Sequence, residues 1–240
     1  MDCGLEVKNR VQWIKEVLAD SKADGIVYGN SGGKDCTLVA ILCRKAAENV
    51  TGIMMPCESS VNYGLDKKHA LAAAKQYDIR TEEIDLTAVK VAFREVLGDK
   101  IGDCAMAYAN INPRLRMTAL YAYAYSKNYL VAGTGNRSET TLGYFTKWGD
   151  GAYDFNPISD LTVSEVYELL EYLGAPREII DKAPSAGLYE GQTDERELGF
   201  SYQAVDNFLL KGEGDAEIVE KIEKRIASTS HKRKPPLTYR

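Results

Sequence analysis

The feature that most constrains the fold is the stretch YGNSGGKDC at residues 28–36, where an apolar run stops and two glycines precede a charged pair. The run at 25–28 is short, partly β-branched and bounded by polar residues, which is typical of a buried strand. Residues 34–46 then carry apolar side chains at helical spacing. The sequence therefore predicts a strand that enters a helix through a glycine-rich loop.

Such a loop is suited to hold phosphate. The first backbone N–H groups of a helix have no partners within the helix, and glycine lets an anion approach without a Cβ in the way. Walker A is excluded because Tyr28 and Asp35 stand where it needs Gly and Ser or Thr, and the GxGxxG fingerprint is also lacking. An ordinary strand-to-helix turn and the SGGxDS loop of ATP pyrophosphatases, which SGGKDC resembles, remain as alternatives.

Length and composition predict one α/β domain over residues 1–240. The chain is 45% hydrophobic and 27% charged, which is ordinary for a soluble globular protein. The sequence has no apolar run long enough for a bilayer, and its first residues resemble neither a signal nor a transit peptide. We therefore expect a cytoplasmic protein without a membrane partner.

Cysteine and histidine usage limits the metals that the chain would bind. Five cysteines without a CxxC pair and only two histidines argue against disulfides, a zinc site and a histidine cluster. Any metal should then be a hard, oxygen-ligated cation. The net charge of −5 gives no general attraction for nucleic acid, which favours a small nucleotide held by local basic residues.

Strands and helices alternate along the chain. Further strands are predicted at 50–55, 80–86 and 129–133, and helices at 6–18, 65–77, 110–126, 163–173, 176–182, 201–210 and 215–228. Alternation of this kind predicts a parallel sheet covered by helices on both faces, with ligands at the carboxyl ends of the strands.

The helix at 110–126 is predicted to begin with Asn112 as N-cap and Pro113 as its first residue. Arg114 and Arg116 would then lie in its first turn, where cations oppose the helix dipole unless they hold an anion. The sequence supports equally well the alternative that both arginines are solvated and that the helix has only a packing role.

A second polar loop at 134–139 follows the strand at 129–133 and would face the first loop. Glu139 and Asp35 would then share Mg²⁺, which at phosphate sites uses one or two carboxylates with phosphate oxygens. Alternatively, Glu139 caps a helix or faces solvent. Residues 143–151 have the composition of a mobile loop that covers a ligand, and 183–198 is predicted to be irregular.

Several stretches together resemble the ammonia-dependent NAD synthetase family over nearly the whole chain. They are SGGKDC (31–36), NINPRLRM (110–117), GTGNRSE (133–139), GYFTKWGDG (143–151), DFNPISDL (154–161), PSAGLYEGQTDE (184–195) and HKRKPP (231–236). The resemblance implies an adenine nucleotide alpha hydrolase-like (Rossmann-like) three-layer α/β sandwich. It also implies a homodimer that converts nicotinic acid adenine dinucleotide (deamido-NAD) to NAD, consuming ATP and ammonia and releasing AMP and pyrophosphate.

In that reaction the nicotinate carboxylate attacks the α-phosphorus of ATP, and ammonia opens the acyl-adenylate. Backbone N–H groups of residues 32–35 and the Ser31 hydroxyl would hold the departing pyrophosphate, with Mg²⁺ on Asp35 and Glu139. Asp150 is our hypothesis for the base that takes a proton from ammonium. The chain leaves no room for a nitrilase-like glutaminase domain, so we expect free ammonia or ammonia from a separate protein.

Carried over position by position, the resemblance implies two sets of contacts. The ATP-binding set is Gly29, Asn30, Ser31, Gly32, Gly33, Lys34, Asp35, Cys36, Thr134 and Ser185. The set for deamido-NAD is Arg114, Lys147, Asp154, His231 and Lys232. The basic C-terminal tail, which on its own resembles a solvated end, would reach the substrate across the dimer interface.

Three sites depart from the family pattern. Cys36 replaces a serine and is a weaker hydrogen-bond partner, Asn112-Pro113 replaces a Lys-Ala pair, and Val163 stands where many members place an ATP-contacting lysine. Val163 is therefore left out of the site. The rival classes are another ATP pyrophosphatase, as in tRNA modification or GMP synthesis, and a non-catalytic nucleotide-binding relative. A tRNA enzyme would show an RNA-binding domain or a strongly basic face, and this sequence shows neither.

Overall fold

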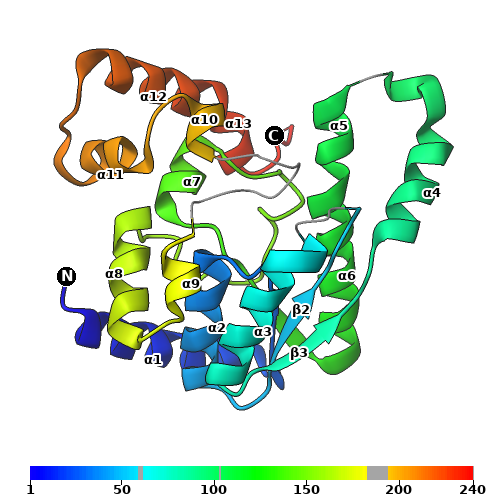
Figure 1. The fold of residues 1–240 in the computed structure, drawn as a ribbon, viewed down its shortest axis with the longest axis vertical. Coiled ribbons are helices and arrows are strands. Elements are labelled where there is room, and N and C mark those ends of the chain that lie inside the picture. Colours follow the sequence, from blue (N-terminus) through cyan, green and yellow to red (C-terminus); the bar gives the residue numbers. More distant parts are fainter. Residues whose placement is uncertain (59–61, 103, 183–193, 240) are drawn as a thin grey trace.

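The computed structural model describes residues 1–58, 62–102, 104–182 and 194–239. In these ranges four strands form one sheet in the order β3-β2-β1-β4 (Figure 1). They are β1 (Gly25–Gly29), β2 (Val50–Met54), β3 (Arg80–Glu83) and β4 (Tyr129–Ala132). Every pair of neighbours is parallel, so the predicted parallel sheet is confirmed.

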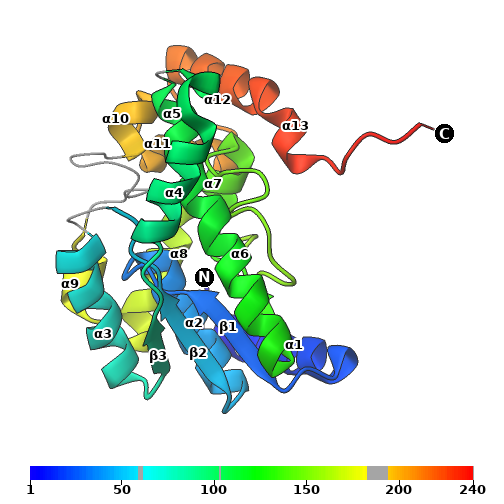
Figure 2. The same ribbon diagram turned by 90° about the vertical axis from the view of Figure 1, so that its right-hand side faces the viewer.

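Helices cover both faces of the sheet, which gives the expected three layers (Figures 1 and 2). On one face α1 (Cys3–Ser21), α2 (Lys34–Ala46) and α8 (Val163–Leu173) pack in a buried cluster that includes Ile26. On the other face α6 (Ile111–Lys127) packs against Val27. Successive residues of β1 thus point into opposite apolar layers, which explains its continuous apolar run.

The remaining helices lie at the edges of the sheet or beyond the carboxyl ends of its strands. α3 (Lys67–Gln76) packs beside β2 and β3. α7 (Arg137–Leu142) and the C-terminal helices share a third buried cluster around Val205 and Ile222. The C-terminal helices are α11 (Tyr202–Lys211) and α12 (Ala216–Ser228), with α13 (Ser230–Arg233) leading into an extended tail (Figure 2).

A helical arm stands beside α6 and projects past the sheet (Figure 1). It consists of α4 (Thr87–Leu97), the 3₁₀ turn η2 (Gly98–Ile101) and α5 (Ala105–Ala109). The other short elements are η1 (Asn62–Asp66), α9 (Arg177–Ile180) and α10 (Asp194–Leu198). Within the described ranges, no helix combines the length and the apolar character needed to cross a membrane.

Two local predictions were wrong. α6 begins at Ile111 rather than after a cap at Asn112, because α5 leads almost directly into it through Asn110, whose backbone is helical. Asn112 is buried in the first turn instead, where its Oδ1 accepts a 3.4 Å bond from the Cys57 thiol. α10 occupies the end of the segment predicted to be irregular, and residues 183–193 lie outside the described part.

Candidate nucleotide-binding site

The candidate site lies where the order of the strands reverses. From β1 the chain continues to β2 and β3 on one side, whereas β4 pairs with β1 on the other. Tyr28 pairs with Ala132, so the loops after these two strands leave the sheet side by side. The two predicted loops therefore face each other in the kind of crevice that binds ligands in open α/β sheets.

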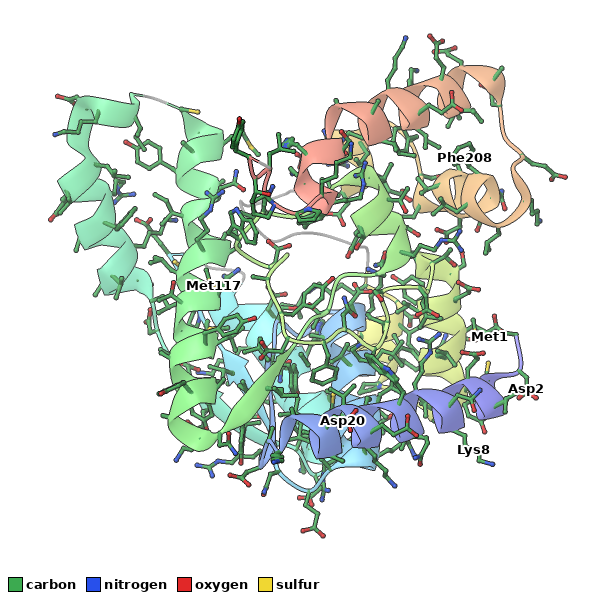
Figure 3. The ribbon with its side chains drawn as sticks, turned by 180° about the vertical axis from the view of Figure 1, so that it is seen from behind. Met1, Asp2, Lys8, Asp20, Met117 and Phe208 are labelled. Carbon is green, nitrogen blue, oxygen red and sulfur yellow. The ribbon has the colours of Figure 1, made fainter. Side chains whose placement is uncertain are left out.

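These loops and later segments line a cavity of about 370 Å³. Most of the predicted residues line it: Gly29, Asn30, Ser31, Gly33, Lys34, Asp35, Cys36, Thr134, Glu139, Asp150 and Lys232. In Figure 3, Met117, which also lines the cavity, lies on the α6 side, and Phe208 lies across from it in the C-terminal helices.

The phosphate loop is held in a conformation that only glycine adopts easily. Gly32 has φ +69°, and a Cβ there would collide with the Asp66 carbonyl oxygen and lie 3.0 Å from the Ala70 nitrogen. Asn30 Oδ1 accepts a 3.3 Å bond from the Gly32 N–H. The loop is therefore packed against the start of α3, and Gly32 supports the cavity without lining it.

Cys36 faces the inside of this loop. Its Sγ lies 3.3 Å from Ser31 Oγ and 3.2 Å from the Gly33 carbonyl oxygen. Burial raises the pKa of the Cys36 thiol, with hydrogen bonds from Ser31 and Gly33 opposing the shift. The side chain is thus a neutral thiol that braces Ser31 and the loop backbone.

Lys34 lies between two carboxylates. Its Nζ is 2.6 Å from Asp35 Oδ2 and 3.7 Å from Glu139 Oε1, and the side chain is only 7% exposed. Burial alone would lower the pKa of Lys34, but the charges of Asp35 and Glu139 outweigh burial and raise it. Asp35 is held in place from its other oxygen, Oδ1, by a 3.0 Å bond from Asn136 Nδ2.

Glu139 both caps a helix and faces the cavity, so the two sequence alternatives for it are combined. Its Oε2 accepts the Asn136 N–H at 3.3 Å in the capping box of α7, while Oε1 faces Lys34. Burial and then the neighbouring Asp35 raise the pKa of Glu139 to about 8, and Asp194 adds to the shift. The Glu139 carboxyl therefore takes up a proton more readily than an exposed carboxyl would.

Asp35 and Glu139 fit a hard cation. One ammonium group already contacts both, so a single ion can bridge them, and carboxylate oxygens are suitable donors for Mg²⁺. Among the residues that the structure describes, no group of three or more His, Cys, Asp or Glu side chains could hold a metal alone. Oxygens of a substrate would have to complete the coordination shell.

The stretch at 143–151 is tied down by distant residues. Lys232 Nζ donates to the carbonyl oxygens of Gly143 (2.8 Å) and Phe145 (2.7 Å). Within the loop, the Thr146 N–H donates to Asp150 Oδ1 at 3.0 Å. Asp150 is exposed toward the cavity, yet the surrounding protein atoms desolvate its carboxyl group and raise its pKa, with the N–H of Thr146 opposing.

Four residues of the predicted deamido-NAD set lie outside the cavity lining. Arg114, Lys147 and His231 lie together, because Arg114 donates to the Lys147 carbonyl (3.3 Å) and Lys147 Nζ to the His231 carbonyl (2.8 Å). Asp154 is exposed and its Oδ2 accepts the Val131 N–H at 2.7 Å. Ser185 lies outside the described residues.

Sequence reasoning missed several cavity residues. Asp66 and Lys182 form a 2.6 Å ion pair between segments far apart in the chain, so no local motif could have indicated them. Arg116, for which the sequence left an anion contact and a solvated position as equal alternatives, also lines the cavity, and its Nε donates to the Met55 carbonyl at 3.0 Å. Val163 is buried in the cluster of α7 and α11 and is not part of the lining.

Comparisons with known proteins agree with this geometry. The family model described as NAD synthase matches residues 6–236. The NH(3)-dependent NAD(+) synthetase of Carboxydothermus hydrogenoformans is 45% identical over 229 residues, which cover 94% of this chain and 93% of that protein. NMN synthetase from Francisella tularensis superposes with a TM-score of 0.94 at 36% identity, covering 100% of this chain and 99% of that one. The NH3-dependent NAD synthetase from Campylobacter jejuni gives 0.83 at 31% identity, with both chains fully covered.

The fold and the cavity define an α/β enzyme with a nucleotide-binding site at its switch point. The chain belongs to the NAD synthase family. It is therefore a ligase of NAD biosynthesis that forms a C–N bond, with ammonia-dependent NAD synthetase function and ATP as a substrate. The family resemblance noted in the sequence is confirmed.

Proposed function

We propose that the chain adenylates the nicotinate carboxylate of deamido-NAD with ATP in this cavity and that ammonia then displaces AMP. The observation that carries the proposal is the meeting of the phosphate loop with Asp35 and Glu139 at the switch point. A carboxylate is a poor electrophile, so adenylation first supplies a leaving group. The step needs neutralisation of charge more than covalent help from the protein.

The phosphate loop would hold the departing pyrophosphate. Ser31 and the first residues of α2 line the cavity, as does Thr134, and the free N–H groups of a helix start suit an anion there. Asp35 and Glu139 would hold Mg²⁺, which when bound offsets negative charge on phosphate oxygens. Cys36 would keep Ser31 oriented rather than touch the phosphate itself.

Asp150 would accept a proton from ammonium during attack on the adenylate. It lines the cavity, its pKa is raised by burial, and one oxygen is oriented by the Thr146 N–H, which are properties that suit a general base. Asp150→Asn should lower ammonia-dependent turnover by roughly 100-fold or more. Pyrophosphate released in the absence of ammonia should change little, and turnover close to that of the unaltered protein would exclude this role.

The function is tested by incubation with ATP, Mg²⁺, ammonium and deamido-NAD. NAD, AMP and pyrophosphate in equal amounts support the proposal. AMP formed only with another acceptor would indicate a different ATP pyrophosphatase, and binding without cleavage would indicate a non-catalytic relative. Replacing ammonium by glutamine, with and without a separate glutaminase, identifies the nitrogen source.

A second candidate substrate is the mononucleotide of nicotinic acid. The TM-score of 0.94 with an enzyme named NMN synthetase favours it, and the predicted dinucleotide contacts Arg114, Lys147 and His231 lie outside the cavity. The two substrates should be compared at equal concentration in the same assay. A kcat/KM at least tenfold higher for the mononucleotide would make the chain an NMN-forming enzyme.

Two side chains of α4 support our proposal of a homodimer. No residue of α4 is buried, and Phe93 and Val96 are 46% and 78% exposed. An apolar helix face of this kind favours association with a second copy. Val96→Glu should shift the sedimentation mass toward the monomer, whereas Leu210→Glu on α11 should not.

We also propose that the protein acts in the cytoplasm.

A further inference from the structure

The phosphate loop at 31–36 contains a lysine, Lys34, next to the two carboxylates of the site. Lys34 is buried, and its ammonium group touches Asp35 and faces Glu139, the two carboxylates that fit a hard cation. The ammonium group also lies over the Tyr202 ring, with Nζ 5.9 Å from the ring centroid. The ammonium group therefore occupies the position from which one ion would contact both carboxylates.

Lys34 and a divalent ion cannot share this position, because their like charges would repel at close range in a poorly solvated cavity. Lys34 is the first residue of α2, so its backbone belongs to the helix start, whose N–H groups have no partners within the helix. Its flexible four-carbon stem allows the ammonium group to turn while the backbone stays in place. The anion that would attract it there is the polyphosphate at the loop.

We propose that Lys34 is a placeholder cation: it neutralises Asp35 and Glu139 before the nucleotide binds and then turns to the pyrophosphate end of ATP. The proposal rests on the function proposed above and adds a role for one side chain. This role predicts opposite effects on the binding of a metal and on the binding of polyphosphate. Removing the ammonium group should strengthen binding of a metal to the nucleotide-free protein and weaken binding of polyphosphate.

The test uses Lys34→Met and Lys34→Arg in the full chain. Binding of Mn²⁺ alone is measured by electron paramagnetic resonance, and binding of inorganic pyrophosphate with saturating Mg²⁺ by calorimetry. We expect Lys34→Met to bind Mn²⁺ roughly tenfold more tightly and pyrophosphate roughly tenfold more weakly, the size of one charge-assisted contact. Lys34→Arg should remain near the original values in both.

Lys90→Met is the matched control. Lys90 lies on α4, is also a partly buried lysine, and its Nζ pairs with Glu58 at 3.2 Å. It is not part of the cavity lining. The control variant should change neither affinity. Unchanged or weaker Mn²⁺ binding in Lys34→Met would overturn the placeholder role. Unchanged pyrophosphate binding in that variant would overturn the contact between Lys34 and the pyrophosphate end of ATP. If Lys34→Met does not fold, Lys34→Gln serves the same comparison.

The outcome is separable from that of the proposed function. If the unaltered protein makes NAD but neither affinity shifts in Lys34→Met, only the inference on Lys34 fails. If both affinities shift as expected but no amide product forms from deamido-NAD, the proposed reaction fails and the inference on Lys34 stands as a property of a polyphosphate site.

Discussion

Two loops line the same cavity but are held in different ways. The phosphate loop at 31–36 is held by hydrogen bonds of Asn30 and Cys36 within the loop and by the packing of Gly32 on the start of α3. The aromatic loop at 143–151 is held by Lys232 from the far end of the chain and by Asn110, whose Oδ1 accepts a 2.5 Å bond from the Thr146 hydroxyl. The first should respond to substitutions within the loop and at the start of α3, and the second to substitutions at Lys232 and Asn110.

The largest effect should come from Gly32→Ala. The new Cβ meets backbone strain at φ +69° and a collision with the Asp66 carbonyl, so we expect about 2 kcal/mol or more of lost stability and a strong loss of ATP binding. Thermal unfolding and calorimetry with an ATP analogue measure both.

Gly212→Ala separates strain from collision in that experiment. Gly212 has the same φ of +69°, and no atom of the described part of the chain lies within 4 Å of its added Cβ. It should therefore lose only about 1 kcal/mol. Equal losses in the two variants would mean that packing on α3 does not hold the phosphate loop.

Lys232→Met should disturb only the aromatic loop. Two hydrogen bonds from a charged donor are lost at a partly exposed site, so we expect about 1 kcal/mol of lost stability and a rise in KM for the nicotinate substrate. Pyrophosphate binding with Mg²⁺ should stay unchanged. Lys224→Met, at an exposed ion pair on α12, is the control. A parallel loss of pyrophosphate binding would show that the two loops are coupled.

Cys36→Ser should have a smaller effect. A hydroxyl can make the contacts to Ser31 and the Gly33 carbonyl that the thiol makes now, so we expect equal or higher turnover. Steady-state kinetics and the melting temperature test this. A large loss of turnover with an unchanged melting temperature would assign the thiol a role beyond bracing the loop.

The smallest effect concerns His69 on α3, beneath the phosphate loop. It is buried, and its Nδ1 has no hydrogen-bond partner among the residues that the structure describes. Burial, and then the charge of Lys182, lowers the pKa of His69. The unfolded chain then binds a proton first as pH falls below about 6.5, so stability should decrease there.

Denaturant unfolding at pH 7.5 and 5.5 measures this contribution. His69→Gln cannot take up that proton and should lose less stability between the two pH values than the unaltered protein. If the free energy of unfolding depended on pH identically in both proteins, the lowered pKa of His69 would be contradicted.

Local patterns predicted much of the fold. The helix predicted at 163–173 is α8, and the helix predicted at 215–228 is α12 with Asp215 as its N-cap. In both helices the apolar spacing and the cap residue lie within a short stretch of sequence. Interactions between neighbours in sequence therefore determine these helices. The predicted cap at Asn112 failed because α5, which had not been predicted from the sequence, precedes α6 directly.

By itself, the sequence determined the strand, the glycine-rich loop and the helix at 25–46, because backbone sterics at Gly32 and the free N–H groups of a helix start act over a few residues. Only the tertiary structure decided what surrounds them. Glu139 reaches Lys34 because β4 pairs beside β1, and Lys232 reaches the aromatic loop because α13 packs above it. Such contacts depend on chain segments that meet only when the core forms. The order of strands and loops predicted that Asp35 and Glu139 face each other, but not that Lys34 lies between them.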